Sequence, residues 1–268
     1  MHCIWLSDLF STGLRTGLLI RRIDDTEEDM DFDWKFFWEV VRGSSKAIPL
    51  TLYLSLWSFF FGLLIALVVA ILRYKKVFIL DKFADFYVSF IRGTPVILQL
   101  YLVYYIIPAL VDNLMIKWGF SFRMNQVEIK KLVVLTLSIN MSAYLAETIR
   151  GGLNSLGRSE IEAAMSIGMT SGQILRRIII PQVLVISIPN FSSHLIGIIQ
   201  ATSLAFYVTL VEITGTARLM AMDNWKYYEA YLATGLIYWL LTVAVEIVTF
   251  IIEKLVEKRG YVLRARRA

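Results

Sequence analysis

The stretch SEIEAAMSIGMTSGQILRRIIIPQ (159–182) decides how the rest of this sequence is interpreted. It is amphipathic, and it lies between long apolar runs. Ser159 followed by Glu162 matches the capping box, in which two side chains satisfy free backbone N–H groups at the start of a helix. Thr170 followed by Gln173 matches the same pattern. The segment therefore predicts two short helices.

Two further residues indicate how these helices are joined and where they stop. Gly168 lies between the two predicted helix starts, where the chain needs a residue that tolerates a left-handed backbone. Pro181 lacks a backbone N–H, so we expect it to end the second helix and to open the next apolar run. The sequence thus predicts a helix–Gly–helix pair over 159–180.

The composition places this pair in a membrane protein. Of the 268 residues, 57% are hydrophobic and 18% are charged, and the mean hydropathy is +0.62. Soluble domains are usually about one quarter charged. The net charge of +5 comes from basic residues that flank apolar runs, which is typical of topology signals and does not indicate nucleic-acid binding. We expect an all-α membrane protein with one membrane domain.

The composition also excludes several kinds of chemistry. A single cysteine, Cys3, forms neither an internal disulfide nor a cysteine-based metal site. His194 has no second ligand near it in the sequence, so we expect it to be a hydrogen-bonding group between helices and not a metal ligand. The GxxxxGK[ST] phosphate-binding loop is absent from the sequence, so we expect that the chain is not an enzyme and does not hydrolyse ATP itself.

Uncharged runs predict five membrane-spanning helices, because about 20 apolar residues cross the hydrocarbon core. The predicted spans are 47–72, 93–111, 132–149, 187–211 and 230–252. Gly93 and Pro95 are expected to break the helix at the membrane edge before the second span. The fourth span contains Pro189 and Asn190, so we expect it to be bent or interrupted.

The segments around the spans divide the chain. We predict an N-terminal extension (1–29) that is dispensable, an interfacial amphipathic segment (30–46), a transmembrane domain (47–256) and a basic tail (257–268). Trp34, Phe37 and Trp38 suit the headgroup region. Basic residues are more numerous after the first, third and fifth spans than in the opposite segments. This bias predicts a cytoplasmic helix pair, a cytoplasmic C-terminus and an N-terminus outside.

Motifs along the whole membrane domain resemble one family. FIRGTPVILQL (90–100), SAYLAETIRGGL (142–153) and ATSLAFYVTLVEITG (201–215) are similar to segments of permease subunits of polar amino-acid ABC importers, such as the histidine, glutamine and arginine systems. The helix pair resembles the EAA loop of these subunits. The resemblance covers about residues 33–256. It departs from the family at Gln200 and Ala201, where many members carry a Lys-Asp pair.

The resemblance implies a fold, partners and site residues. The fold is that of a type I ABC importer permease, with a cytoplasmic helix–Gly–helix coupling loop at 159–181 and a location in the bacterial inner membrane. The partners are an ATPase dimer that binds ATP and Mg, a second permease subunit, identical or related, and an extracytoplasmic solute-binding protein that delivers a polar amino acid. The residues expected to contact the ATPase are Glu162, Ala163, Ala164, Gly168, Ile178 and Pro181.

Polar residues within apolar spans predict a path for the substrate, because each is costly in lipid unless it is paired or faces a polar cavity. The candidates for this path are Gln99, Asn140, Glu147, Gln200, Thr202 and Ser203. Hydrogen bonding between helices is the alternative for each of them. Glu147 could instead pair with Arg150 or another basic residue, and Glu246 could be solvated.

Two other functions compete with the importer subunit. A stand-alone secondary transporter is the main alternative, although the five predicted spans contain no internal repeat. A membrane enzyme is the second, although the sequence offers no metal cluster and no nucleophile–base pair. An ATPase gene and a binding-protein gene beside this one would favour the importer over both.

Overall fold

The structure is a computed structural model that describes residues 32–74, 78–121 and 123–258. The extension predicted at 1–29 and most of the basic tail predicted at 257–268 lie outside these residues. In chain order, the described helices are α2 (Trp34–Ser45), α3 (Ile48–Tyr74), α4 (Leu80–Gly93), α5 (Val96–Tyr101), the π-helix η1 (Leu102–Ile106), α6 (Ile107–Lys117), the 3-10 helix η2 (Met124–Gln126), α7 (Ile129–Asn154), α8 (Arg158–Ser166), α9 (Ser171–Ile174), the π-helix η3 (Leu175–Ile179), α10 (Ile180–Ala201), the 3-10 helix η4 (Thr202–Val208), α11 (Ile213–Met222) and α12 (Tyr227–Lys258).

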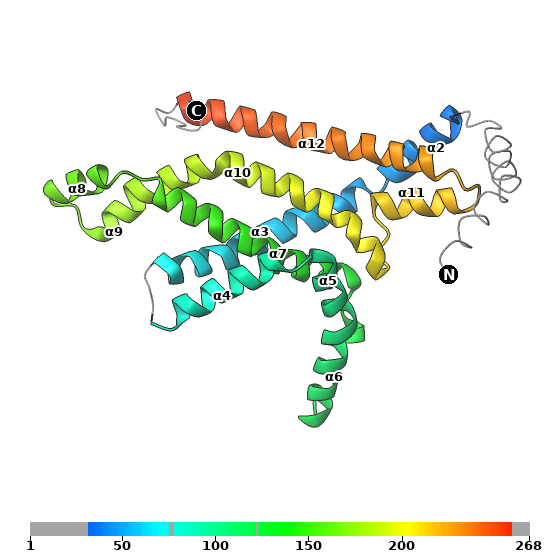
Figure 1. Cartoon of the computed structure of the whole chain (residues 1–268), viewed down its shortest axis with the longest axis horizontal. Coiled ribbons are helices and arrows are strands. Elements are labelled where there is room, and N and C mark those ends of the chain that lie inside the picture. Colours follow the sequence, from blue (N-terminus) through cyan, green and yellow to red (C-terminus); the bar gives the residue numbers. More distant parts are fainter. Residues whose placement is uncertain (1–31, 75–77, 122, 259–268) are drawn as a thin grey trace, which may run out of the picture.

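Five helical stretches are long and apolar enough to cross a membrane, as the sequence predicted. They are Ile48–Tyr74, Val96–Lys117, Ile129–Asn154, Ser171–Val208 and Tyr227–Lys258. α3, α7, α10 and α12 run along the long axis of the molecule (Figure 1), and α10 packs against each of the other three. The short pair α8–α9 lies at the same end of the molecule as the C-terminal end of α12, and α2 lies at the opposite end.

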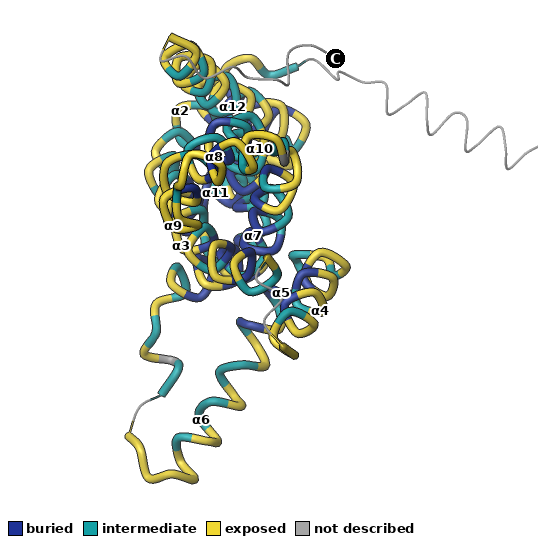
Figure 2. Tube along the Cα trace, turned by 90° about the vertical axis from the view of Figure 1, so that its left-hand side faces the viewer, coloured by how far each residue is buried: buried dark blue, intermediate teal, exposed yellow. Residues whose placement is uncertain are grey.

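The second crossing differs from the predicted run at 93–111. α4 packs against α3 and α7 and runs beside them, whereas α6 turns crosswise and projects from the body of the molecule (Figures 1 and 2). The helix breaks between Gly93 and Val96, as Gly93 and Pro95 predicted. The sequence pattern hid the contribution of α4 because its charged residues, among them Asp85 and Arg92, reduce its hydropathy.

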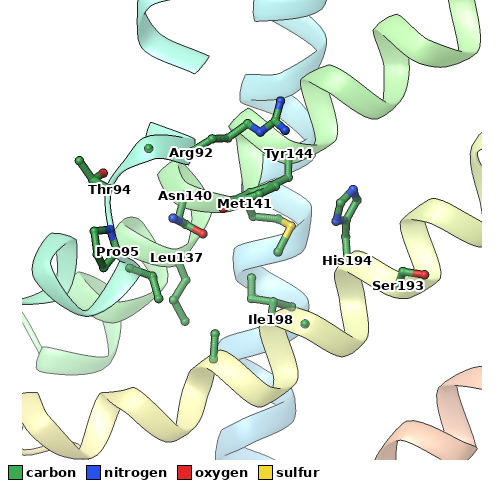
Figure 3. A pocket seen from close by; sticks show the side chains of 14 residues that line it. Arg92, Thr94, Pro95, Leu137, Asn140, Met141, Tyr144, Ser193, His194 and Ile198 are labelled. Atoms are coloured by element: carbon green, nitrogen blue, oxygen red, sulfur yellow. The ribbon is translucent and has the colours of Figure 1, made fainter. Parts of the chain in front are cut away.

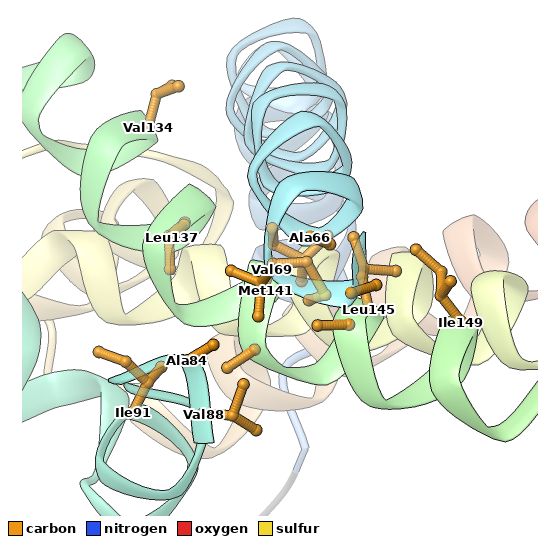
Figure 4. Close-up of a cluster of buried hydrophobic side chains, with 14 of the residues drawn as sticks. Ala66, Val69, Ala84, Val88, Ile91, Val134, Leu137, Met141, Leu145 and Ile149 are labelled. Atoms are coloured by element: carbon orange, nitrogen blue, oxygen red, sulfur yellow. The ribbon is translucent and has the colours of Figure 1, made fainter. Parts of the chain in front are cut away.

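α7 is the central helix, and its partner α3 fits against it through small side chains. The buried positions of α3 include Ser58, Gly62 and Ala66, which repeat every fourth residue on one face. A Cβ atom at Gly62 would lie 3.1 Å from the Ser138 carbonyl oxygen, so the glycine permits the close approach. Figure 4 shows Ala66 of α3 beside Met141 of α7 in this core, to which both helices contribute small and large side chains.

The fourth span is longer than predicted, because Pro181 does not end a helix. α9, η3, α10 and η4 follow one another without a break from Ser171 to Val208. In η3 the Ile180 amide donates to the Leu175 carbonyl, five residues back. Pro181 follows this π turn directly and has no amide to place in the ladder. The prediction that Pro181 separates the helix pair from the fourth span was therefore wrong.

A second, smaller cluster joins the N-terminal helix to the opposite end of the bundle. α2 is amphipathic, as predicted, with Trp34 and Trp38 exposed, but Phe37 is buried against α11 and α12 and not at a lipid surface. Asp33 caps α2 by accepting from the Phe36 amide at 2.9 Å, and it pairs with Lys226 just before α12. α2 is thus fixed to the bundle at its first residue.

Candidate functional site

The turn between α8 and α9 depends on Gly168. Its φ is +83°, in the left-handed region, as predicted. The Gly168 amide donates to the Met165 carbonyl at 2.9 Å, and the Met169 amide donates to the Ala164 carbonyl at 3.1 Å. These two bonds form the Schellman motif, which ends a helix with a left-handed residue. A Cβ atom at Gly168 would meet nothing within 4 Å, so the glycine is needed for its backbone conformation and not for space.

One of the two predicted capping boxes is present. The Thr170 hydroxyl accepts from the Gln173 amide at 3.4 Å, and the Gln173 side chain accepts from the Thr170 amide at 2.9 Å. The box at Ser159 and Glu162 was wrong, because α8 begins two residues earlier than expected, with Gly157 as its N-cap. Glu162 is therefore exposed and is not used as a cap.

The pair α8–Gly168–α9, which we call the coupling pair, has two different faces. Ala164 and Ile174 are buried in the main core and fix the pair to the membrane domain. Met165 and Ile167 lie on the other face with 55% and 77% of their surface exposed. Both side chains are therefore open to a partner at this end of the molecule. Met165 and Ile167 were not singled out from the sequence, because helical periodicity does not tell which apolar residues face away from the bundle.

The predicted coupling residues occupy both faces and the helix that follows. Glu162, Ala163 and Gly168 are exposed, Ala164 is buried, and Ile178 and Pro181 are half-buried in η3 and α10. The coupling pair is also tied to α10 by a hydrogen bond of 2.9 Å from the Gln182 amide group to Glu160. The pair is thus a firmly attached projection.

A charge cluster joins three helices near the same end of the bundle. Glu147 of α7 accepts from Arg73 of α3 and, at 2.6 Å, from Arg150. Arg73 also donates to Asp85 of α4 at 2.6 Å. Arg92 of α4 is farther away, 3.9 Å from the Glu147 carboxylate. The pairing of Glu147 with Arg150 that the sequence left open is present, and it is part of a larger network that fixes α4 beside α3 and α7.

Two adjoining cavities lie between α4, α5, α7 and α10. The first has a volume of about 480 Å³ and the second about 450 Å³, and both are lined by Arg92, Tyr144 and His194. Asn140 lines the first, and Figure 3 shows it across from His194. Asn190 lines the second. We call this space the polar chamber, because cationic, aromatic and amide side chains face it together.

Contacts within the chamber position its walls. The Arg92 guanidinium carbon lies 5.6 Å from the centre of the Tyr144 ring, a cation–π distance. His194 of α10 is hydrogen-bonded to Thr148 of α7 at 2.8 Å, as expected for a group that joins helices. The Ser187 hydroxyl also lines the chamber, is buried, and has no hydrogen-bond partner among the described residues. The chamber thus offers polar groups to a small polar molecule.

The structure brings together some of the predicted path residues and separates others. Gln99 is buried and accepts from the Asn140 amide at 3.1 Å, while its own amide donates to Thr94 and to the Ile91 carbonyl. Asn140 and Glu147 line the chamber. Gln200, Thr202 and Ser203 are not among its lining residues. Thr202 is fully buried and donates to the Ile199 carbonyl at 2.6 Å. Arg92 and Tyr144 are chamber residues that the sequence did not single out.

A fully buried carboxylate lies between η4 and α11. Glu212 caps α11, accepting at 2.9 Å from the Thr214 amide and at 2.9 Å from the Gly215 amide, and it accepts from the Tyr238 hydroxyl of α12 at 2.8 Å. Burial raises the pKa of the Glu212 carboxyl, although these donors act to lower it. The 201–215 motif includes this acidic residue, but the motif did not predict that the residue links α11 to α12.

These features define a class of protein: a multi-pass helical transport subunit with a polar chamber between its spans and an exposed helix pair at one end. The chain belongs to the family of binding-protein-dependent transport system inner membrane components, whose model matches residues 58–258.

Individual relatives agree with this assignment. The chain is 33% identical over 226 residues to the probable amino-acid permease protein YxeN of Bacillus subtilis, covering 84% of this chain and 96% of that one. It is 36% identical over 212 residues to the octopine transport system permease protein OccM of Rhizobium meliloti, covering 78% and 84%. A crystal structure of an amino acid ABC transporter with histidines matches at a TM-score of 0.70 and 25% identity, covering 84% and 99%. The MetNI methionine ABC transporter shares the fold, at a TM-score of 0.62 and 19% identity.

The protein is therefore the permease subunit of a binding-protein-dependent ABC importer for amino acids. It is a multi-pass inner membrane protein that works in a complex with ATPase subunits and a binding protein, and the ATPase subunits handle ATP. The alternative of a stand-alone secondary transporter is excluded by this membership.

Proposed function

We propose that this subunit forms half of a membrane channel for a polar amino acid, with the coupling pair in the cytoplasm as the docking site of the ATPase. The observation that carries the proposal is the coupling pair itself, an exposed, firmly attached projection at one end of the bundle. The basic residues favour a cytoplasmic location for that end. The C-terminal end of α12 lies at the same end, and α2 lies at the other, outer end.

The two faces of the coupling pair suit a transmitter of force. Ala164 and Ile174 pack the coupling pair against the core, so a displacement of the pair is transmitted to the helix bundle. Ile167 and Met165 supply an exposed apolar contact, and Glu162 adds a charge for a basic partner surface. A docking surface of this kind buries its apolar residues at the centre and keeps charges at the rim.

A second permease subunit is supported by a polar stripe on α10. Asn190, Ser193, Gly197 and Gln200 follow one another at intervals of three and four residues, so they share one face, and all four are exposed. Exposed polar side chains within an apolar span are costly in lipid. A facing subunit, identical or related, covers this stripe and encloses the polar chamber.

The polar chamber suits an amino acid as the transported molecule. The Arg92 side chain is 46% exposed and 3.9 Å from the nearest carboxylate, so its guanidinium is available to a substrate carboxylate. Asn140 and Asn190 offer neutral polar contacts, as the passage of molecules with different side chains requires. Relatives carry the names of octopine, nopaline and L-cystine transport systems, all polar amino-acid compounds. We assign this chain the same class of substrate.

Cysteine labelling tests the topology on which the proposal rests. Ser171, exposed at the start of α9, is replaced by cysteine in a background without Cys3. A membrane-impermeant thiol reagent should label it only after the cells are permeabilised. Labelling of intact cells from outside would contradict the cytoplasmic location of the coupling pair, whatever the transport activity of the variant.

A further inference from the structure

An apolar groove lies outside the polar chamber, between α3, α7 and the η3–α10 stretch. Its volume is about 290 Å³. Every side chain that lines it is aliphatic or aromatic, between Leu63 and Tyr74 on α3, at Ile149 and Leu153 on α7, and between Leu175 and Phe191 on η3 and α10. Several of these residues, such as Ile71 and Leu184, are half exposed, so the groove is open at the surface of the bundle.

The length of the groove matches one leaflet of a bilayer. Its lining residues on α3 run from Leu63 to Tyr74, 11 residues further along the helix, which is roughly 16 Å at about 1.5 Å per residue. Half of a hydrocarbon core is about 15 Å. Tyr74 is the last residue of the α3 span, and Leu175 follows directly after α9. The groove therefore extends from the coupling-pair end of the bundle to about mid-membrane.

A basic residue is the chain neighbour of a residue that lines the groove. Arg176 follows the lining residue Leu175 directly and precedes the lining residue Ile179 by three positions within η3, on the side of the coupling pair. Its neighbour Arg177 precedes Pro181, which does not line the groove. Both side chains are exposed, and neither has an ion pair or hydrogen bond among the described residues. By contrast, Arg73 and Arg150 are held by carboxylates.

We propose that the groove holds an acyl chain of an anionic phospholipid from the cytoplasmic leaflet, with the lipid phosphate on Arg176. An acyl chain fits a narrow apolar groove one leaflet long, and basic pockets between spans on the cytoplasmic side suit anionic headgroups. The leaflet follows from the topology of the proposed function. The lipid joins α3 to the helix that carries the coupling pair, so its presence stiffens that connection.

The test is native mass spectrometry of the complete transporter, permease with ATPase, titrated with phosphatidylglycerol or with phosphatidylcholine of the same chain length. The wild type should retain phosphatidylglycerol in preference to phosphatidylcholine. Arg176→Gln should weaken phosphatidylglycerol retention about fivefold, the effect of one basic residue near an anionic headgroup. Arg177→Gln, the matched control one residue away, should retain the lipid like the wild type.

A second variant examines the groove itself. Leu184→Trp adds bulk at a lining position that is 48% exposed, so it fills the groove without overpacking the core. It should lower retention of both lipids. Equal retention by Arg176→Gln and Arg177→Gln, or equal binding of the two lipids by the wild type, would overturn the proposal. Loss of the ATPase from Arg176→Gln with lipid retention unchanged would assign Arg176 to the ATPase contact instead. Labelling of the Ser171→Cys variant from outside would contradict the topology of the proposed function. It would not contradict lipid binding in the groove, because lipid retention is measured separately.

Discussion

Gly168 is the residue whose replacement should most affect coupling to the ATPase. Gly168→Val places a β-branched side chain at a positive φ, which costs about 1–2 kcal/mol and re-aims α8 and α9. The variant should insert normally, because no span is changed, but lose stimulation of the ATPase by the loaded binding protein in reconstituted vesicles. Gly168→Asn is the control, because asparagine tolerates this conformation. Full stimulation with valine would mean that the turn does not transmit the signal.

Glu212 should stabilise the packing of α11 against α12 through its bond with Tyr238. Glu212→Gln turns one acceptor oxygen into a donor that faces other donors, at a cost of about 1–3 kcal/mol. Tyr238→Phe should destabilise by less, because only one bond is lost. Thermal unfolding in detergent measures both. If the pair acts together, the double variant should lose less than the sum of the two. If the two losses of stability are strictly additive, Glu212 and Tyr238 do not act as a pair.

Single residues differ in how well the sequence predicted them. Gly168 and the Thr170 cap were predictable, because both depend on hydrogen bonds within a few residues of the chain. The Ser159 cap was not, because α8 begins at Arg158 after Gly157, and no side-chain cap bond marks that start. Arg92 could not be assigned to the chamber from sequence, since its neighbours Tyr144 and His194 come from α7 and α10.

At the scale of elements, the polar stripe of α10 predicts a pattern of water access. Asn190→Cys and Ser193→Cys, in the background without Cys3, should react with a charged thiol reagent, because both positions line the chamber and a wet chamber permits the thiolate. Leu184→Cys, on the groove side of the same helix, should stay unreactive, because hydrocarbon suppresses the thiolate. Mass spectrometry of the labelled subunit gives the comparison. Equal labelling at all three positions would contradict the facing subunit and the enclosed chamber.

The boundaries of the helices show which features a count of apolar residues cannot detect. Each predicted span overlaps one of the five long helical stretches, and the runs 132–149 and 230–252 lie wholly within theirs. Long uncharged stretches favour a helix because it satisfies every backbone group in lipid. The count missed α4, since its charged residues lower its hydropathy, although one of them, Asp85, pairs with Arg73 of α3. The continuation of the helix through Pro181 was not predicted either, because the spacing of residue types does not indicate a π turn.

At the scale of the whole molecule, the N-terminal segments should differ sharply in importance. A chain that starts at Met30 keeps α2 and should assemble and transport normally. A chain that starts at Ala47 loses Phe37 and Val40 from the second cluster, each worth about 1.5–3 kcal/mol of burial. It should show a lower unfolding temperature and fewer intact complexes on size exclusion. Failure of the Met30 chain to insert would show that residues 1–29 have a structural role.

The unbroken helix from Ser171 to Val208 has a mechanical consequence. At about 1.5 Å per residue its 38 residues span roughly 57 Å, from the coupling pair to the turn that leads into α11. A tilt of about 5° around its midpoint moves each end by roughly 2.5 Å, in opposite directions. The two ends of the path are therefore joined by one continuous stretch of helix, so we expect a movement imposed at the coupling pair to change both ends together.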